Sequence, residues 1–383
     1  MPVVPLDTAS SYSLLDGLFT PAKLVAAAKQ RGYSAMALAD HGVMYGTVEF
    51  YQAALAAGIK PLLALRLDLA IGDAGNNVLP VVFVAENSTG YQHLMILSSM
   101  KQTQQAGQQH PLTVKEIKTY LSDLFTVVLP TDSVGLAAGN SGSVDMLASL
   151  RQDVDDRHLL MGISPHLSNV LRTTIIQQAK HYQMPLIAAT SVRYLDPQDR
   201  FAYETVHHIA ENTAIANPLE EAKKKGKYFL PTVKQLITDY QQAGLADALA
   251  QCEELVNACQ VQLQFQPPVL PQFPTPNGLD SPAYLRQLCL KGLEKRHPAS
   301  RIDPLRYRQR LDHELAIINQ LGFDDYFLIV HDVMAYTKQH EIFTDAGRGS
   351  AAGSLVAYVL GITEVDPLRF NLQIGRASCR ERV

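Results

Sequence analysis

The sequence predicts an α/β protein followed by a separate, mainly helical part. Two observations support this prediction. In the first 195 residues, short apolar runs rich in β-branched residues alternate with stretches of helical periodicity. Residues 264–278, QFQPPVLPQFPTPNG, contain five prolines. Because proline can continue neither a helix nor a central strand, we place a domain boundary in this segment.

The alternation in the first part predicts strands and helices in regular succession. The predicted strands are residues 35–39, 61–70, 80–85, 125–129, 158–163 and 185–189. The predicted helices are residues 21–31, 47–57, 90–101, 114–121, 143–151 and 167–182. Thr20 suits an N-cap, and Pro21 suits the first turn of a helix. Repeated strand–helix units favour a parallel sheet or barrel, with functional groups at the carboxyl ends of the strands.

Helical patterns dominate the rest of the chain. They run from residue 197 to 262, with a polar interruption at 220–227. After the proline-rich segment, the predicted helices are residues 282–295, 304–321, 326–336 and 355–360. The glycine-rich segment GRGSAAGS, residues 347–354, directly precedes the last of them.

Composition excludes several classes of protein. The chain has 383 residues, of which 47% are hydrophobic and 18% charged, so we expect two or three folded domains rather than disorder. No apolar run reaches the roughly 18 residues that a membrane span needs. The N-terminus lacks a basic segment followed by an apolar core, and the four cysteines are widely spaced. We therefore expect a cytoplasmic protein with free thiols and no membrane contact.

Charge is unevenly distributed. The net charge of −4 does not favour nucleic acid as a partner of the whole chain. Residues 284–310, however, are strongly basic, which is typical of a surface that follows DNA phosphates. A solvated helical face, or a surface that packs within the domain, is the alternative. The candidate DNA-facing residues are Arg286, Lys291, Lys295, Arg296, Arg306, Arg308 and Arg310.

The strand predicted at residues 35–39 leads into Asp40 and His41. Carboxylate and imidazole at a strand end are potential metal ligands. A metal centre needs further ligands, and arginine cannot supply one because it stays protonated. We therefore expect no metal here, and interpret the pair as a cap or a hydrogen-bonding pair. The neighbouring strand ends hold poor ligands: Asp7, Arg66, Ser191 and Arg193.

Residues 347–354 are the sharpest motif in the chain. Small residues let backbone N–H groups approach an anion, and Ser350 and Ser354 carry hydroxyl donors. Arg348 can bind phosphate oxygens through its forked guanidinium, and a following helix would add its positive dipole end. The pattern indicates a phosphate-binding turn. A tight helix–helix contact made by small residues is the alternative.

Two stretches resemble a known family. HELAIINQLGFDDYFLIV and GRGSAAGSLVAYVLGITEVDPLRFNL, within residues 310–372, resemble the polymerase core of bacterial replicative DNA polymerase III alpha subunits, the C family. SYSLLDGLFTPAKLVAAAKQRGYSAMALADHGVMYGTVEFYQAALAAGIKP, residues 11–61, resembles the polymerase-and-histidinol-phosphatase (PHP) domain that precedes that core.

The resemblance implies an α/β fold class with several parts. A distorted (β/α)7 PHP barrel is expected at residues 1–200 and its helical extension at 201–263. After the linker at 264–278, the N-terminal part of a truncated polymerase-beta-like palm, an α+β unit, is expected at 279–373. Residues 374–383, IGRASCRERV, resemble the translation of a sequencing-library adapter, and we interpret them as an artefact.

The resemblance also implies an activity. Family members add deoxynucleotides to a primer 3′ end in DNA replication, using two Mg²⁺ ions. Their Gly-Arg-Gly-Ser turn contacts the incoming triphosphate, which carries over to Gly347, Arg348, Gly349, Ser350 and, less directly, Ser354. Their catalytic aspartates follow the position of Leu372, where this chain has no such motif. We therefore expect no catalytic residue in this fragment and no polymerase activity from it alone.

The PHP ligands carry over poorly. The family's His-x-His matches Asp7 and Ala9, its glutamate matches Arg66, and its late Asp-x-His matches Ser191 and Arg193. Asp40 and His41 are retained. A structural scaffold without bound metal is expected, with Arg66 replacing lost metal charge. A metal-dependent PHP phosphoesterase or 3′–5′ exonuclease is the alternative. Implied partners are primer–template DNA, a deoxynucleoside triphosphate and other replication subunits, such as a proofreading exonuclease or sliding clamp.

Overall fold

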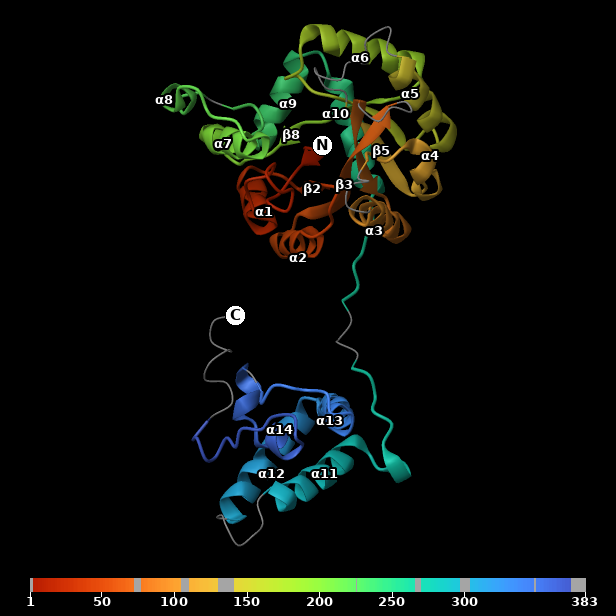
Figure 1. Cartoon of the computed structure of the whole chain (residues 1–383). Coiled ribbons are helices and arrows are strands. Elements are labelled where there is room, and N and C mark those ends of the chain that lie inside the picture. The colour runs from red at the N-terminus through yellow and green to blue at the C-terminus, as the bar shows by residue number, and fades with distance from the viewer. Residues whose placement is uncertain are drawn as a thin grey trace. The chain divides into compact units, whose positions relative to one another are not determined.

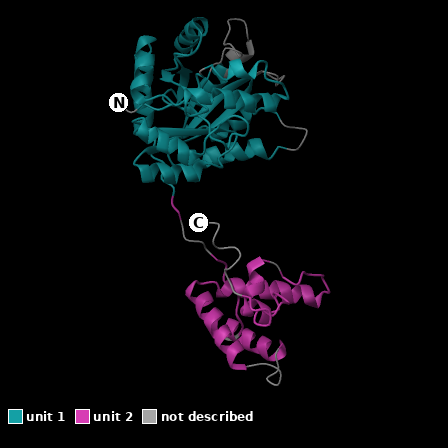
Figure 2. Ribbon diagram, turned by 90° about the vertical axis from the view of Figure 1, so that its left-hand side faces the viewer, with its two compact units in different colours: residues 1–263 teal, residues 264–383 magenta. Residues whose placement is uncertain are grey.

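The computed structural model describes residues 3–71, 77–104, 110–129, 141–224, 226–265, 270–296, 304–347 and 349–372. The chain divides into two compact units, unit 1 (residues 1–263) and unit 2 (residues 264–383), shown in Figure 2. The division falls where the proline-rich segment begins. The last ten residues, which we interpret as adapter-encoded, lie outside the described residues.

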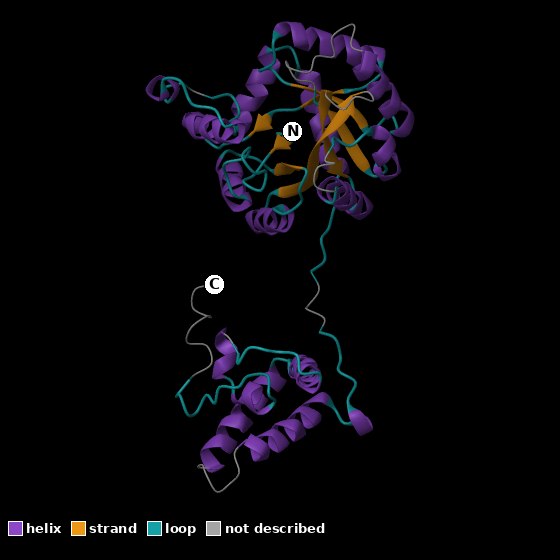
Figure 3. Cartoon of the chain, in the orientation of Figure 1, coloured by secondary structure: helices purple, strands orange, loops and turns teal. Residues whose placement is uncertain are grey.

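Unit 1 contains a six-stranded sheet and a separate two-stranded pair (Figure 3). In spatial order, the six strands are β2 (Ala35–His41), β3 (Lys60–Ile71), β4 (Asn77–Ala85), β5 (Leu124–Val128), β6 (Leu159–Ile163) and β7 (Leu186–Ala188). The separate pair joins β1 (Asp7–Thr8) to β8 (Ser191–Val192) in parallel. The six predicted strands and the α/β class are confirmed, whereas β1 and β8 were not predicted.

The prediction of a parallel sheet is wrong for one strand. β4 is antiparallel to both of its neighbours, β3 and β5, while the other pairs in the sheet are parallel. Only residues 72–76 separate β3 from β4. A parallel crossover needs a dozen or more residues, so this short connection requires the chain to reverse.

Helices cover the outside of the curled sheet (Figure 1). Thr20 caps the first helix, because its side chain accepts a hydrogen bond from the Lys23 N–H, as predicted. The first helices are α1 (Pro21–Gln30), α2 (Thr47–Ala57), α3 (Ser88–Gln102), α4 (Val114–Ile117), α5 (Ser141–Asp153) and α6 (Asn169–His181). A 3₁₀ turn, Lys118–Tyr120, extends α4. After β8 come a 3₁₀ turn (Pro197–Asp199), α7 (Arg200–Glu211), α8 (Pro218–Glu221), α9 (Val233–Gln242) and α10 (Ala246–Ala258).

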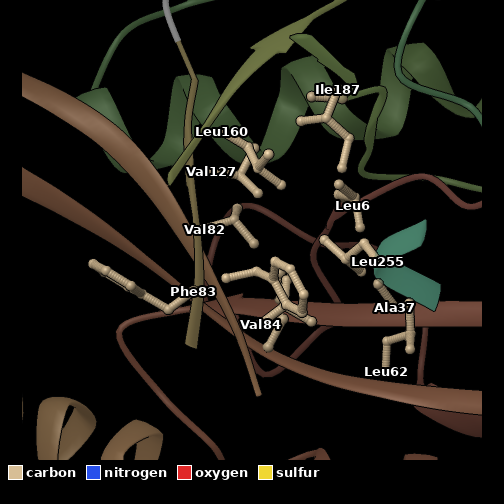
Figure 4. Close-up of a cluster of buried hydrophobic side chains, with 14 of the residues drawn as sticks. Leu6, Ala37, Leu62, Val82, Phe83, Val84, Val127, Leu160, Ile187 and Leu255 are labelled. Atoms are coloured by element: carbon tan, nitrogen blue, oxygen red, sulfur yellow. The ribbon is translucent and has the colours of Figure 1, made fainter. Parts of the chain in front are cut away.

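The core of unit 1 lies around the sheet, whose strands are buried over most of their length. Such strands are typical of a sheet covered on its faces, and each buried large apolar side chain contributes about 1.5–3 kcal/mol. Side chains from several strands and from α10 meet in one cluster (Figure 4). The cluster includes Leu6, Ala37, Leu62, Val82, Val84, Val127, Leu160, Ile187 and Leu255.

Unit 2 has a core of its own, and helices are its only regular elements besides 3₁₀ turns over the described residues. At one helix crossing, a Cβ atom added to Gly292 would lie 2.1 Å from the Val359 carbonyl oxygen, so only glycine fits. The helices are α11 (Ser281–Arg296), α12 (Pro304–Gln320), α13 (Asp324–Gln339) and α14 (Leu355–Val359). The 3₁₀ turns are Pro276–Gly278 and Gly349–Gly353.

Three cysteines are buried free thiols, Cys252 and Cys259 in unit 1 and Cys289 in unit 2. Burial raises the pKa of each thiol to about 12, so all three are neutral at physiological pH. Among the helices that the structure describes, none is long and apolar enough to cross a bilayer.

Candidate functional site

A cavity of about 620 Å³ lies beside β1 and β8 in unit 1. Its walls combine acidic, basic and aromatic side chains with apolar residues. Two chain positions far apart in sequence, β1 and β8, contribute Asp7 and Ser191. The charged and aromatic lining residues are Asp7, Asp16, His41, Arg66, His166, Arg193, Tyr203, His207, Lys227 and Tyr228.

Asp7 lies between two arginines in this wall. The Arg193 Nη2 donates to both Asp7 carboxylate oxygens, at 2.9 Å each. The Arg66 Nη1 contacts the same two oxygens at 3.2 and 3.3 Å. The Ser191 hydroxyl donates to Asp7 Oδ2 at 2.6 Å. Asp7 and Arg193 are both almost fully buried, at 2% and 4% exposure, so this is an internal ion pair.

The electrostatics of Asp7 follow from these contacts. Burial opposes ionisation, but the positive charges of Arg193 and then Arg66 hold the pKa of the carboxyl well below its usual range. Asp7 is therefore ionised at physiological pH. Arg193 also donates through Nε to Asp16 Oδ1, at 3.0 Å, and through Nη1 to the Asp7 carbonyl, at 2.8 Å. One guanidinium thus ties β1 to the segment after β8.

Asp40 belongs to a different network. Its carboxylate accepts hydrogen bonds from the Ser10 backbone N–H (2.7 Å), the Ser10 hydroxyl (2.9 and 3.0 Å) and the Ser13 hydroxyl (2.7 Å). Burial raises the pKa of Asp40, although these hydrogen bonds oppose the shift. The adjacent His41 instead faces Asp68, with 3.1 Å between His41 Nε2 and Asp68 Oδ2. Asp40 and His41 therefore act as the hydrogen-bonding residues that the sequence suggested.

The residues present do not fit a PHP-type metal centre. Asp7, Asp40 and His41 each have other partners, and two guanidinium groups contact the Asp7 carboxylate. Over the part of the chain that the structure describes, no group of three or more His, Cys, Asp or Glu is arranged to hold a metal ion. A cation placed against Asp7 would meet the positive charges of Arg66 and Arg193.

Sequence reasoning missed several residues that line this cavity, and also Asp68, which does not line it but contacts two lining residues, His41 and Arg66. Asp68 lies two positions after Arg66 on β3, and this alternate spacing was the available signal that both face the same side. His207 also lines the cavity, with its Nε2 3.7 Å from Asp16 Oδ1. Asp16 and Tyr203 carried no sequence signal, because their positions depend on the tertiary fold.

The glycine-rich turn lies in unit 2. Gly347 has φ of +118°, and a Cβ there would lie 2.9 Å from Thr363 Cγ2, so both conformation and space require glycine. Gly349 has φ of +63°. Gly349 and Ser350 are exposed, whereas Arg348 lies outside the described residues. Gly349 and Ser350 thus offer accessible backbone and one accessible hydroxyl.

The last residue of the turn is placed differently. Ser354 is buried and caps α14, where its Oγ accepts a hydrogen bond from the Ala357 N–H at 3.1 Å. The same hydroxyl donates to Glu314 Oε2 at 2.9 Å. Any contact between Ser354 and a phosphate would therefore require these two hydrogen bonds to be exchanged.

The basic segment is largely paired within unit 2. Arg286 contacts Asp312 at 2.8 Å, with Arg308 3.8 Å from the same side chain. Arg296 contacts Glu364 at 2.9 Å and lies over the Tyr358 ring. Arg310 contacts Glu314 at 2.5 Å. The other three candidates, Lys291, Lys295 and Arg306, are exposed.

Comparison with known proteins agrees with this two-part organisation. Residues 6–158 match the PHP domain, and residues 283–383 match the bacterial DNA polymerase III alpha NTPase domain. The first part of the chain is therefore similar to a PHP domain and its last part to the alpha NTPase domain, so the family resemblance stated above is confirmed.

Curated relatives are similar to the chain along its whole length. The DNA polymerase III subunit alpha of Bacillus subtilis (strain 168) is 32% identical over 398 residues, covering 100% of this chain and 34% of the relative. That of Escherichia coli (strain K12) is 32% identical over 396 residues, covering 99% and 34%. That of Aquifex aeolicus is 28% identical over 409 residues, covering 99% and 35%. The chain thus spans about a third of the length of these relatives.

Proposed function

We propose that this chain is part of a replicative DNA-directed DNA polymerase, in which unit 2 contacts the triphosphate of the incoming deoxynucleotide. The contact would involve Gly347, Arg348, Gly349 and Ser350. The observation that carries the proposal is the exposure of Gly349 and Ser350 in the glycine-rich turn, within a region similar to the alpha NTPase domain. Backbone N–H groups of such a turn, with a serine hydroxyl and a guanidinium, suit phosphate oxygens.

Binding of dATP, measured by calorimetry, tests this proposal. Ser350→Ala should weaken binding about fivefold, because one hydroxyl hydrogen bond to phosphate is lost. Ser99→Ala removes the same atoms from an exposed site on α3 and should leave the affinity unchanged. Equal affinities for Ser350→Ala and the unaltered chain would contradict a role for this turn.

The intact polymerase would need more than this chain. Its cofactor would be Mg²⁺, and its partners primer–template DNA, deoxynucleotides and other replication subunits, including a proofreading exonuclease or a sliding clamp, in the cytoplasm. The described residues bring no set of carboxylates together that could hold two metal ions. We therefore propose that the 383-residue chain alone does not extend a primer. Mg²⁺-dependent elongation by the purified chain would overturn this.

We further propose that the PHP domain is a structural scaffold. The Asp7–Arg193–Arg66 cluster supports this role. Both guanidinium groups contact the Asp7 carboxylate, so positive charge already occupies the position that a metal ion bound to Asp7 would take. The sequence suggested Arg66 as the replacement for metal charge; Arg193 lies closer to Asp7 and is more deeply buried. In this role the domain would hold its strands together and brace neighbouring subunits.

Elemental analysis separates the scaffold from its alternative, a metal-dependent phosphoesterase or exonuclease. After dialysis against metal-free buffer, we expect only substoichiometric zinc or manganese and no hydrolysis of a phosphomonoester. Stoichiometric metal that disappears in Asp40→Ala would instead support the phosphoesterase. Ser99→Ala serves as a control for nonspecific metal binding.

A further inference from the structure

A buried carboxylate lies at the end of the glycine-rich turn. Glu314, on α12, is only 3% exposed. It accepts hydrogen bonds from the Ser354 hydroxyl at 2.9 Å, the Leu355 N–H at 3.1 Å and the Val356 N–H at 3.0 Å. Glu314 therefore satisfies the first N–H groups of α14 from inside the unit.

Arg310 completes this arrangement from the preceding turn of α12. Its Nε donates to Glu314 Oε1 at 2.5 Å, and its Nη2 donates to the Gly353 carbonyl at 3.0 Å. The ion pair thus holds both the last carbonyl of the 3₁₀ turn and the first N–H groups of the following helix. A buried carboxylate is costly unless it is paired and hydrogen-bonded, and here Glu314 meets both conditions.

These contacts divide the motif into two parts. At its C-terminal end, an internal anion already occupies the position that a phosphate would take at the start of α14. Nearer its N-terminal end, Gly349 and Ser350 are exposed and Gly347 is partly exposed. An anion approaching the C-terminal end would also be repelled by the Glu314 charge.

We propose that Glu314, together with Arg310, is a positioning residue that fixes the C-terminal end of the turn, so that a triphosphate contacts Gly347, Gly349 and Ser350 and not Ser354. This inference rests on the proposed function of unit 2. Its physical basis is that a turn held in one conformation does not lose backbone freedom when a ligand binds.

The test uses sodium tripolyphosphate as the probe, titrated by calorimetry into the full chain without divalent metal. Glu314→Gln removes a negative charge close to the motif, so simple electrostatics predicts tighter binding. Positioning predicts the reverse, about tenfold weaker binding, because the turn loses its anchor. Asp312→Asn, on the same helix, removes the same charge at a half-exposed position and should not weaken binding.

Two serine variants sharpen the reading. Ser350→Ala should weaken binding several-fold, while Ser354→Ala should leave the affinity within about twofold, because its hydroxyl serves Glu314 and α14. Equal losses for the two variants, with hydrogen exchange at the Leu355 and Val356 amides unchanged by Ser354→Ala, would show that Ser354 touches the phosphate and would overturn the proposal. Unchanged or tighter binding by Glu314→Gln, measured where the variant is folded, would also overturn it.

A separate readout distinguishes this inference from the proposed function. Hydrogen exchange at the Leu355 and Val356 amides should be faster in Glu314→Gln than in Asp312→Asn, and unchanged exchange would contradict positioning. If the unaltered chain binds no tripolyphosphate, the proposed function fails. The hydrogen-exchange rates then still show whether Glu314 anchors the start of α14. If Glu314→Gln does not fold, Arg310→Lys, which keeps the charge but loses the bond to Gly353, should weaken binding to a smaller extent.

Discussion

The Arg193 guanidinium and the Asp7 carboxylate form an ion pair inside unit 1, with Arg193 Nη2 2.9 Å from each carboxylate oxygen. The two residues are 186 positions apart in the chain. Through them, the first strand of the unit is fastened to the segment that follows its last strand.

Arg193→Met should destabilise unit 1 by about 3–5 kcal/mol, because it leaves the buried Asp7 carboxylate without its main partner. Denaturant unfolding followed by circular dichroism measures the change. The control is Arg157→Ala, in which the lost side chain is 62% exposed and pairs with Glu86. We expect the control to cost at most about 1 kcal/mol. Equal costs would show that the internal pair adds no stability of its own.

Asp7 also predicts how stability depends on pH. Its pKa is lower in the folded than in the unfolded protein, so its contribution is present above about pH 4 and is lost as pH falls through the folded value. Between pH 4 and pH 2, the free energy of unfolding should therefore fall more steeply for the unaltered chain than for Asp7→Asn. The difference for one group reaches about 1.4 kcal/mol per pH unit.

The contribution of Asp40 to stability changes with pH in the opposite direction. Its raised pKa means that its contribution is greatest at low pH and decreases as pH rises through the folded value. Because Asp40 is present in both proteins, its effect cancels in the comparison. Parallel pH profiles for the unaltered chain and Asp7→Asn would disprove the assigned role of Asp7.

Gly292→Ala should destabilise unit 2, because the added Cβ would lie 2.1 Å from the Val359 carbonyl oxygen and force α11 away from α14. We expect a loss of about 2 kcal/mol, within the range for overpacked cores, even though alanine is the better helix former. Gln287→Ala, at an exposed position of the same helix, is the control and should be nearly neutral. Thermal unfolding of each variant gives the comparison, and a stabilised Gly292→Ala would rule out the close contact.

Because the two units have separate cores, Arg193→Met and Gly292→Ala should act independently. In the double variant, the two losses of stability should add to within about 0.5 kcal/mol. Calorimetry should show each substitution lowering a different unfolding transition. A single transition that both substitutions shift would indicate that the units unfold together.

Regular elements were the predictable part of this fold. The helix expected at residues 47–57 is α2 without any change of bounds, and Gly58 ends it in the left-handed conformation at φ of +72°. β1 and β8 could not be predicted, because each is two residues long and exists only through pairing with the other. The short connection between β3 and β4 could have shown that β4 is antiparallel to β3. The pattern of apolar residues could not, because it is the same for a parallel and an antiparallel strand.

The candidate sites divide in the same way. The sequence showed that Arg66 and Arg193 are unsuitable ligands, but their meeting at Asp7 depends on long-range packing. Glu314 gave no sequence signal, since a glutamate four positions after an arginine is usually a surface pair. Its burial beneath the glycine-rich turn depends on the tertiary fold. The hydrogen bond from the Ser354 hydroxyl to the Glu314 carboxylate depends on it as well.

The buried thiols supply each unit with a chemical reporter of its own opening. Cys252 and Cys259 lie within unit 1 and Cys289 within unit 2, and all three are protonated and shielded. Alkylating reagents react with the thiolate form of cysteine. These side chains therefore remain unlabelled as long as the surrounding structure stays folded. Labelling for different times, followed by peptide mass analysis, would thus measure how often unit 1 and unit 2 each unfold locally, without any engineered probe.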